Sequence, residues 1–159
     1  MIPFIAIILC IIIFFYFKWK QKGQRTARKE KENYKAYLAQ FDTPKDAAKL
    51  EPIYTKIAGV QYKNDDTKQE RQKLIEDAKV GDFLMLVPQA TNMHDSDAVR
   101  VFRLNGDQLG FLNTDLAMEI NSRLSKKVKV EAKITAISGE ENEKEVHIEI
   151  QKYSRKKKH

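Results

Sequence analysis

The sequence predicts a mainly β protein: a small, twisted, mostly antiparallel barrel with two inserted helices. The first indication is strict alternation of apolar and polar residues from Lys127 onward, which is the period of a half-buried strand. The second is Asn105-Gly106 between two apolar segments, because Asn-Gly is the strongest short signal for a β-hairpin. The third is size, since 159 residues with 42% apolar content can bury one core but hardly a second.

Five or six short strands are expected between residues 53 and 153, which we take as the domain. The first contains Gly59, and a glycine inside a strand indicates a bulge or a close backbone approach. The later ones include a continuous apolar run and two alternating segments. The expected strands are Ile53–Tyr62, Asp82–Val87, Val99–Leu104, Gln108–Phe111, Lys127–Ala136 and Val146–Ile150.

Helices are expected where capping residues precede apolar residues at helical spacing. Residues 64–78 begin with Asn64, Asp65 and Asp66, which favour helix N-termini. Residues 114–124 follow the candidate cap Asn113, and their apolar side chains recur every three or four positions. Thr43-Pro44 predicts a further short helix over residues 43–50, which precedes the domain.

Residues 2–17 carry no charge and predict a membrane anchor over residues 1–19. As a helix this run rises about 24 Å, and Lys18 and Trp19 would extend it to the bilayer surface. A cleaved signal peptide fits less well, because the positive charges follow the apolar run. We therefore expect residues 2–19 to contact lipid, with the N-terminus outside the cell membrane and the globular domain in the cytoplasm.

The positive charge lies in the flanks of the domain. Residues 18–52 hold 10 basic and 5 acidic side chains, and residues 20–52 predict a basic helical stalk. Residues 154–159 are a short basic tail, expected to be solvated, whereas residues 53–153 hold 15 basic and 17 acidic side chains. The basic flanks suit anionic lipid or nucleic acid, while the domain alone predicts weak electrostatic attraction to nucleic acid.

Motifs for catalysis are missing from the sequence. There is no phosphate-binding glycine loop and no zinc-spaced Cys/His set, and the one cysteine, Cys10, lies in the apolar run. We therefore expect no enzyme activity and no cofactor. The alternative is a metal-dependent enzyme that uses His94, Asp95 and Asp97, although loop carboxylates more often bond to nearby backbone NH groups.

Residues 91–111 hold a polar turn, a strand and the hairpin, and they carry a resemblance. The turn and strand TNMHDSDAVRV, the hairpin NGDQLGF, Gly59, Gly81 and the helix over 114–124 together resemble the HIRAN domain family. The resemblance covers roughly residues 53–150. It implies an OB-like barrel that, in the helicase-like remodellers of the family, captures the 3′ end of single-stranded DNA.

The resemblance also implies binding residues. Asn92 and Asp95 match polar positions of the family's turn, His94 takes the place of its tyrosine, and Phe111 follows the hairpin Leu-Gly where a ring is usual. Such sites combine stacking on rings with a few polar contacts.

This chain departs from the DNA-binding pattern at three positions. Lys56 and Ile57 stand where paired tyrosines are found, and Met93 replaces the proline of the turn. Tyr62 or His94 can supply the missing rings, and Lys56 completes the expected nucleic-acid-binding set. The resulting prediction is a membrane-anchored module that binds nucleic acid, with single-stranded DNA 3′ ends as the ligand. The alternative is a membrane-tethered domain that binds a protein or a small ligand.

Overall fold

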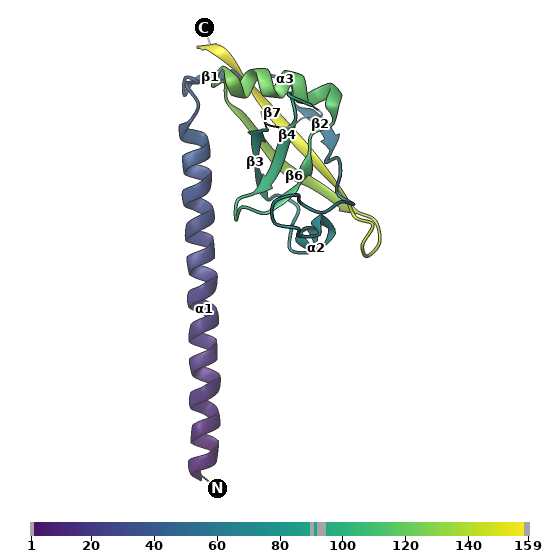
Figure 1. Ribbon diagram of the computed structural model, residues 1–159. Helices are drawn as coiled ribbons and strands as arrows, with labels where there is room; N and C mark the ends of the chain where they lie inside the picture. The colour runs from purple at the N-terminus through teal and green to yellow at the C-terminus, as the bar shows by residue number, and fades with distance from the viewer. Residues whose placement is uncertain (1, 90, 92–94, 158–159) are drawn as a thin grey trace.

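The computed structural model describes residues 2–89, 91 and 95–157 (Figure 1). The described strands form a seven-stranded sheet, which is antiparallel as the sequence predicts but has more strands than the five or six expected. Its strands are β1 (Ala47–Lys49), β2 (Ile53–Lys56), β3 (Phe83–Pro88), β4 (Val99–Arg103), β5 (Gln108–Phe111), β6 (Val130–Ser138) and β7 (Glu145–Lys157). The helices are α1 (Ile2–Ala39), α2 (Arg71–Glu76) and α3 (Thr114–Ser125).

The sheet closes on itself through a single bridge. Its strand order is β1-β7-β6-β3-β4-β5, and β2 pairs with β7 beside β1. Directly after β2, Ala58 pairs with Phe111 at the end of β5. The Ala58 amide donates to the Phe111 carbonyl at 2.8 Å, and the Phe111 amide donates to the Ala58 carbonyl at 3.0 Å. Because closure removes the free edges of β2 and β5, the sheet becomes a small barrel.

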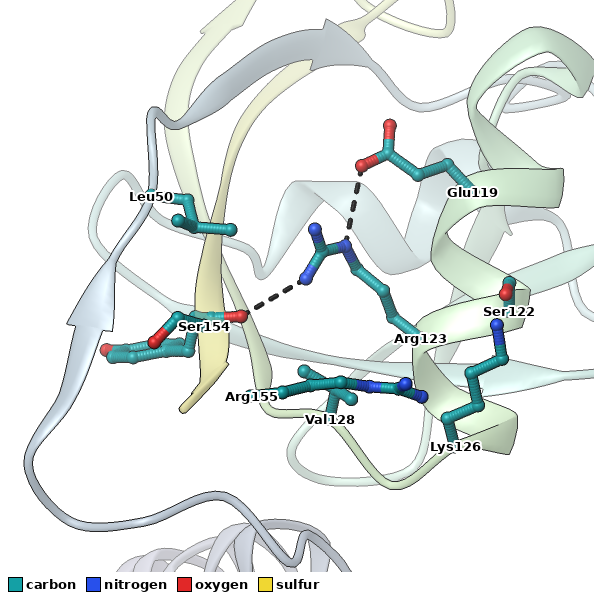
Figure 2. A pocket seen from close by; sticks show the side chains of 9 residues that line it. Leu50, Glu119, Ser122, Arg123, Lys126, Val128, Ser154 and Arg155 are labelled. Atoms are coloured by element: carbon teal, nitrogen blue, oxygen red, sulfur yellow. Dashed lines mark hydrogen bonds and ion pairs between the residues drawn. The ribbon is translucent and has the colours of Figure 1, made fainter. Parts of the chain in front are cut away.

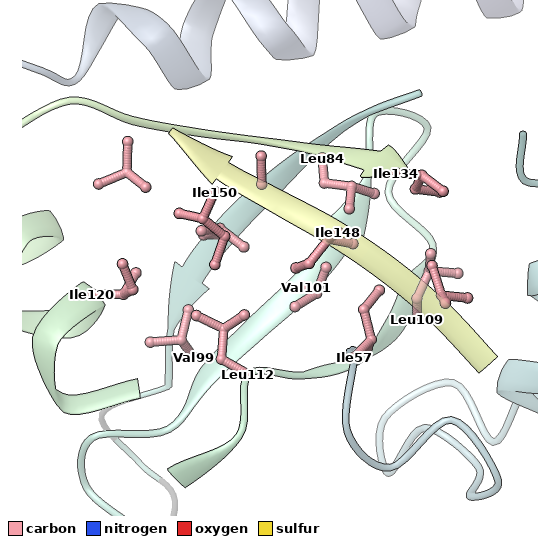
Figure 3. Close-up of a cluster of buried hydrophobic side chains, with 14 of the residues drawn as sticks. Ile57, Leu84, Val99, Val101, Leu109, Leu112, Ile120, Ile134, Ile148 and Ile150 are labelled. Atoms are coloured by element: carbon pink, nitrogen blue, oxygen red, sulfur yellow. The ribbon is translucent and has the colours of Figure 1, made fainter. Parts of the chain in front are cut away.

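The barrel interior is filled by the apolar side of each alternating strand (Figure 3). Val130, Ala132 and Ile134 of β6 are buried, and so are Ile148 and Ile150 of β7. Their polar neighbours point outward, which is the pattern predicted from the alternation.

Two helices lie at opposite ends of the barrel (Figure 1). The prediction of α3 is confirmed, since the helix begins at Thr114 and ends one residue beyond the predicted Leu124. Its predicted cap is also confirmed, because the Asn113 side chain accepts a hydrogen bond from the Leu116 amide at 3.0 Å. Helix α2 is shorter than the predicted 64–78 segment. Asn64 does not cap it, because this side chain is buried and bonds to Arg71 and to the Gln108 carbonyl instead.

The predicted helix over 43–50 and the predicted solvated tail are both wrong. Residues 47–49 form β1, which pairs with the C-terminal half of β7, and β7 continues to Lys157. Ala47 lies opposite Lys157, and Lys49 lies opposite Tyr153. Pairing between these distant segments satisfies their backbone groups, and this outweighs the local capping signal at Thr43-Pro44.

Helix α1 unites the predicted anchor and stalk, and its C-terminal part packs on the barrel. The Tyr34 ring stacks on Phe83 of β3 with centroids 5.1 Å apart. The Tyr37 hydroxyl donates to the Val130 carbonyl at 3.0 Å, and the Phe41 ring packs edge-on against Tyr37. Tyr34 and Tyr37 therefore form the face of α1 that docks on the barrel.

The predicted membrane anchor over residues 1–19 is wrong. In the part of the chain that the structure describes, no helix has an apolar stretch long enough to cross a bilayer. The uncharged stretch of α1 from Ile2 to Phe17 rises about 24 Å, against the roughly 30 Å of a hydrocarbon core. Lys18 and Lys20 follow at once in the same helix. The predicted lipid partner and the location at the cell membrane, with a cytoplasmic domain, depended on this anchor and are withdrawn with it.

Candidate nucleic-acid interface

Three side chains converge on Gly59, beside the point where the barrel closes. Gly59 has a φ of +72°, which favours glycine. A β-carbon at this position would lie 3.0 Å from Nη1 of Arg71, 3.6 Å from Cδ2 of Tyr62 and 3.9 Å from Cδ2 of Phe111. The Tyr62 side chain is 63% exposed, and Phe111 is half-buried. The first-strand glycine therefore brings two rings and a guanidinium group together.

Two hydrogen bonds hold the Arg71 side chain in place beside these rings. It is only 4% exposed, its Nε donates to Asn64 Oδ1 at 2.7 Å, and its Nη1 donates to the Gly59 carbonyl at 2.8 Å. Burial lowers the pKa of Arg71, although a guanidinium group stays charged at neutral pH. The guanidinium carbon lies 5.1 Å from the Phe111 ring centroid, within the range of a cation–π contact.

Gly110 allows Phe111 to reach this position. A β-carbon on Gly110 would overlap the carbonyl oxygen of Ala58 and lie 2.7 Å from Cγ2 of Ile57. The residue before Phe111 must therefore be a glycine if β5 is to approach the segment after β2 closely. This explains in physical terms why Leu-Gly precedes the ring.

A second arginine and a third ring continue the surface on β4. Arg100 pairs with Phe111 across the β4–β5 register, so their side chains are neighbours on one face. The Arg100 guanidinium carbon lies 5.1 Å from the Phe102 ring centroid. Its Nε is buried and has no hydrogen-bond partner among the residues that the structure describes. We call Tyr62, Arg71, Arg100, Phe102 and Phe111 the aromatic–arginine surface.

The predicted binding turn follows β3 and leads into β4. Asn92, Met93 and His94 lie outside the described residues, so the predicted contacts of Asn92 and His94 stay predictions. Asp95 Oδ1 accepts a hydrogen bond from the Asp97 amide at 2.9 Å, and Asp97 Oδ1 accepts one from Asn121 Nδ2 of α3 at 3.1 Å. The end of the turn is therefore fixed to α3.

Lys56, the remaining predicted residue, is oriented toward β7. Its Nζ lies 3.1 Å from Glu145 Oε1, and both side chains are about half exposed. Of the predicted set, Tyr62 and Phe111 meet at Gly59, whereas Lys56 is engaged elsewhere.

Arg71, Arg100 and Phe102 are not among the binding residues predicted from the sequence. With Asn64 as a helix cap, the pattern predicts a helix over residues 64–78 that includes residue 71, whereas the buried Asn64 side chain bonds to Arg71 instead. Arg100 and Phe102 alternate with the buried Val99 and Val101, so the sequence pattern predicts that their side chains point out of the barrel. Their closeness to Phe111 depends on the β4–β5 register.

The fold and this surface define a class: a small, closed antiparallel barrel with rings and arginines gathered where it closes. The HIRAN domain model matches residues 50–153, which is more than half of the chain. The chain therefore belongs to the HIRAN domain family, and the resemblance predicted from the sequence is confirmed.

Solved structures share this fold. The crystal structure of the HIRAN domain of human HLTF is 16% identical, with a TM-score of 0.54, and the match covers 69% of this chain and 81% of that one. A crystal structure of a Lactobacillus plantarum protein is 16% identical, with a TM-score of 0.51 and coverage of 67% and 96%. An NMR structure of the HLTF HIRAN domain is 17% identical, with a TM-score of 0.50 and coverage of 69% and 80%. A search of curated proteins found no match.

Proposed function

We propose that this HIRAN domain binds nucleic acid, and that its ligand is single-stranded DNA with a free 3′ end. The observation that carries the proposal is the convergence of Phe111, Tyr62 and Arg71 on Gly59. Proteins that bind single strands combine rings, on which bases stack, with arginines that contribute cation–π and phosphate contacts. The aromatic–arginine surface has both components.

The separate parts of the surface suit separate parts of the ligand. The exposed Tyr62 ring and the half-buried Phe111 ring are available for base stacking. The half-buried Arg100 side chain lies beside Phe111 across the β4–β5 register, where its guanidinium group can contact a phosphate oxygen. The turn between β3 and β4, with Asn92, His94 and Asp95, is assigned the polar contacts to the terminal sugar on the strength of the family resemblance.

The test is fluorescence anisotropy of the full chain with a short single-stranded oligonucleotide at low salt. One probe ends in a free 3′ hydroxyl, and a matched probe ends in a 3′ phosphate. We expect tighter binding of the first. Phe111→Leu should weaken binding by about 5- to 150-fold, because stacking on a ring is worth about 1–3 kcal/mol per base.

Phe83→Leu is the matched control, since it removes a partly exposed ring from β3 where α1 packs, away from Gly59. Its binding should equal that of the wild type. Equal affinity for both probes would remove the 3′-end assignment. No binding to either probe would falsify the nucleic-acid proposal as a whole.

We also propose that the domain acts by binding alone. In the described residues, no three His, Cys, Asp or Glu side chains lie close enough to hold a metal ion. The carboxylates of Asp95 and Asp97 each accept a hydrogen bond within the protein, which is structural work for both members of the suggested metal set. Isothermal titration with Mg²⁺ or Zn²⁺ tests this, and a stoichiometric binding signal would contradict it.

A further inference from the structure

A hollow of about 530 Å³ lies between the C-terminal half of α3 and the end of β7 (Figure 2). Its polar lining comes from both elements. Helix α3 contributes Glu119, Ser122 and Arg123, and its C-cap residue Lys126 follows; β7 contributes Tyr153, Ser154 and Arg155. Figure 2 shows the Arg155 side chain reaching from β7 toward the α3 end that carries Lys126.

The one carboxylate in this lining is already neutralised. Glu119 Oε1 lies 2.9 Å from Lys152 Nζ and 3.4 Å from Arg123 Nε. Hydrogen bonding from Lys152 lowers the pKa of Glu119, so it stays ionised at neutral pH. Arg123 also donates from Nη1 to the Tyr153 carbonyl at 3.1 Å. The negative charge of Glu119 is therefore balanced by Lys152 and Arg123.

Lys126 and Arg155 remain as cations without an acidic partner. Both are exposed, and neither forms an ion pair with a carboxylate in the part of the chain that the structure describes. Lys126 is the C-cap of α3, where a cation complements the helix dipole. Arg155 has no such local explanation. It stands there because the pairing of β1 with β7 extends β7 to Lys157.

We propose that this hollow holds phosphate groups of the nucleic-acid backbone, as a second contact separate from the aromatic–arginine surface. This inference rests on the proposed function. Two unpaired cations facing one hollow repel each other, and a phosphate between them removes that repulsion and releases counterions from the nucleic acid. Residues 53–153 hold 15 basic and 17 acidic side chains, so Lys126 together with Arg155 of the C-terminal basic segment gives the domain a local electrostatic contact that its composition alone does not predict.

The hollow is far enough from Phe111 for short ligands to miss it. Phe111 lies just before the N-terminal end of α3, and Lys126 follows its C-terminal end. Twelve residues of α-helix span about 18 Å. The end of the turn contacts Asn121, whereas the hollow is lined by Glu119, Ser122 and Arg123 on another side of the helix. Only a longer strand, passing around α3, reaches both contacts.

The test compares the salt dependence of binding for two free-ended oligonucleotides and the full chain. Probes of about 4 and about 16 nucleotides bracket the site sizes of OB folds. The variant Lys126→Gln/Arg155→Gln should bind the long probe with a slope of log K against log salt that is shallower by about 0.7 for each lost phosphate contact. It should bind the short probe like the wild type. The matched control is Lys73→Gln/Lys79→Gln, which removes two exposed lysines near α2.

The outcomes distinguish failure of the second phosphate contact from failure of nucleic-acid binding itself. An unchanged slope on the long probe, with 3′-end preference intact, overturns the second contact alone. An equal change in the control pair also overturns it, because total charge then explains the effect. Failure of the wild type to bind either probe overturns the proposed function and this inference together. Because Lys126 and Arg155 are exposed, urea unfolding should show both variants as stable as the wild type.

Discussion

The guanidinium carbon of Arg71 lies 5.1 Å from the centroid of the Phe111 ring, at the point where the barrel closes. The same arginine bonds to Asn64 and to the Gly59 carbonyl, so it joins the closure of the barrel to the candidate binding surface. Folding and ligand contact therefore share this residue. Changes here should affect both, whereas changes on the exposed side of α2, such as Lys73→Ala, should affect neither.

Arg71→Ala should lower the free energy of unfolding by about 2–4 kcal/mol. The change leaves the buried Asn64 Oδ1 without its donor, which costs about 1–3 kcal/mol. It also removes one of the two hydrogen bonds to the Gly59 carbonyl, which still accepts from the Tyr62 amide, at a cost of about 0.5–1.5 kcal/mol. Urea denaturation followed by circular dichroism measures the loss. Lys73→Ala, on the exposed side of α2, serves as the control and should stay within about 0.5 kcal/mol of the wild type. A loss below about 1 kcal/mol for Arg71→Ala would show that the guanidinium group does not support the fold.

Gly110→Ala should destabilise the barrel by about 1–3 kcal/mol or more, because its β-carbon would overlap the Ala58 carbonyl at the closing bridge. Gly106→Ala separates this clash from backbone strain, since Gly106 has a φ of +99° but no atom within 4 Å of a β-carbon. The Gly106 variant should therefore lose less stability in the same urea experiment. Equal losses would mean that the clash with the Ala58 carbonyl does not account for the loss of stability in Gly110→Ala.

Asp97→Ala and Asn121→Ala should show a coupling energy of about 0.5–1.5 kcal/mol in a double-mutant cycle. The Asn121 amide donates to Asp97 Oδ1 at 3.1 Å and connects the turn to α3. Thermal unfolding of the wild type, both single variants and the double variant gives this energy. A metal-binding role for Asp97 predicts a different result, namely that added Mg²⁺ stabilises the wild type but not the Asp97 variant.

Glu131→Gln should lower the free energy of unfolding at neutral pH and make it depend less on pH in the acid range. Burial alone would raise the pKa of Glu131, but hydrogen bonds from Tyr153 and Tyr34 and the charge of Lys129 bring it below the usual 4.5. A carboxylate with a lowered folded pKa adds stability that is complete above the unfolded pKa and is lost as the pH falls through the folded one. The difference between wild type and variant should therefore shrink below about pH 4.5.

Urea unfolding midpoints measured from neutral pH down to about pH 3 test this prediction. The pH range of the measurement must extend below the usual pKa of a carboxyl group. Tyr34→Phe is the companion variant, because it removes one donor to Glu131 and keeps the ring stacked on Phe83. Its curve should fall between the other two at neutral pH. Parallel curves for the wild type and Glu131→Gln would contradict the role given to this carboxylate.

Local patterns were enough to predict most of the barrel. Alternation identified the buried sides of β6 and β7, Asn105-Gly106 identified the hairpin of β4 and β5, and Asn113 identified the start of α3. Each of these signals acts over a few residues, so it needs no knowledge of distant partners. Local capping failed at Thr43-Pro44 and at Asn64. In both places a partner far along the chain satisfies the backbone or the side chain.

The sequence by itself determined the family, the antiparallel strands and the ring at Phe111, because periodicity, turn chemistry and ordered motifs are properties of short segments. Only the tertiary structure decided that Arg71 and Tyr62 meet Phe111 at Gly59, and that Arg155 faces Lys126 across a hollow. These meetings depend on the register of β5 against Ala58 and of β1 against β7. Register between segments distant in sequence is set by packing of the whole core, which no local pattern encodes.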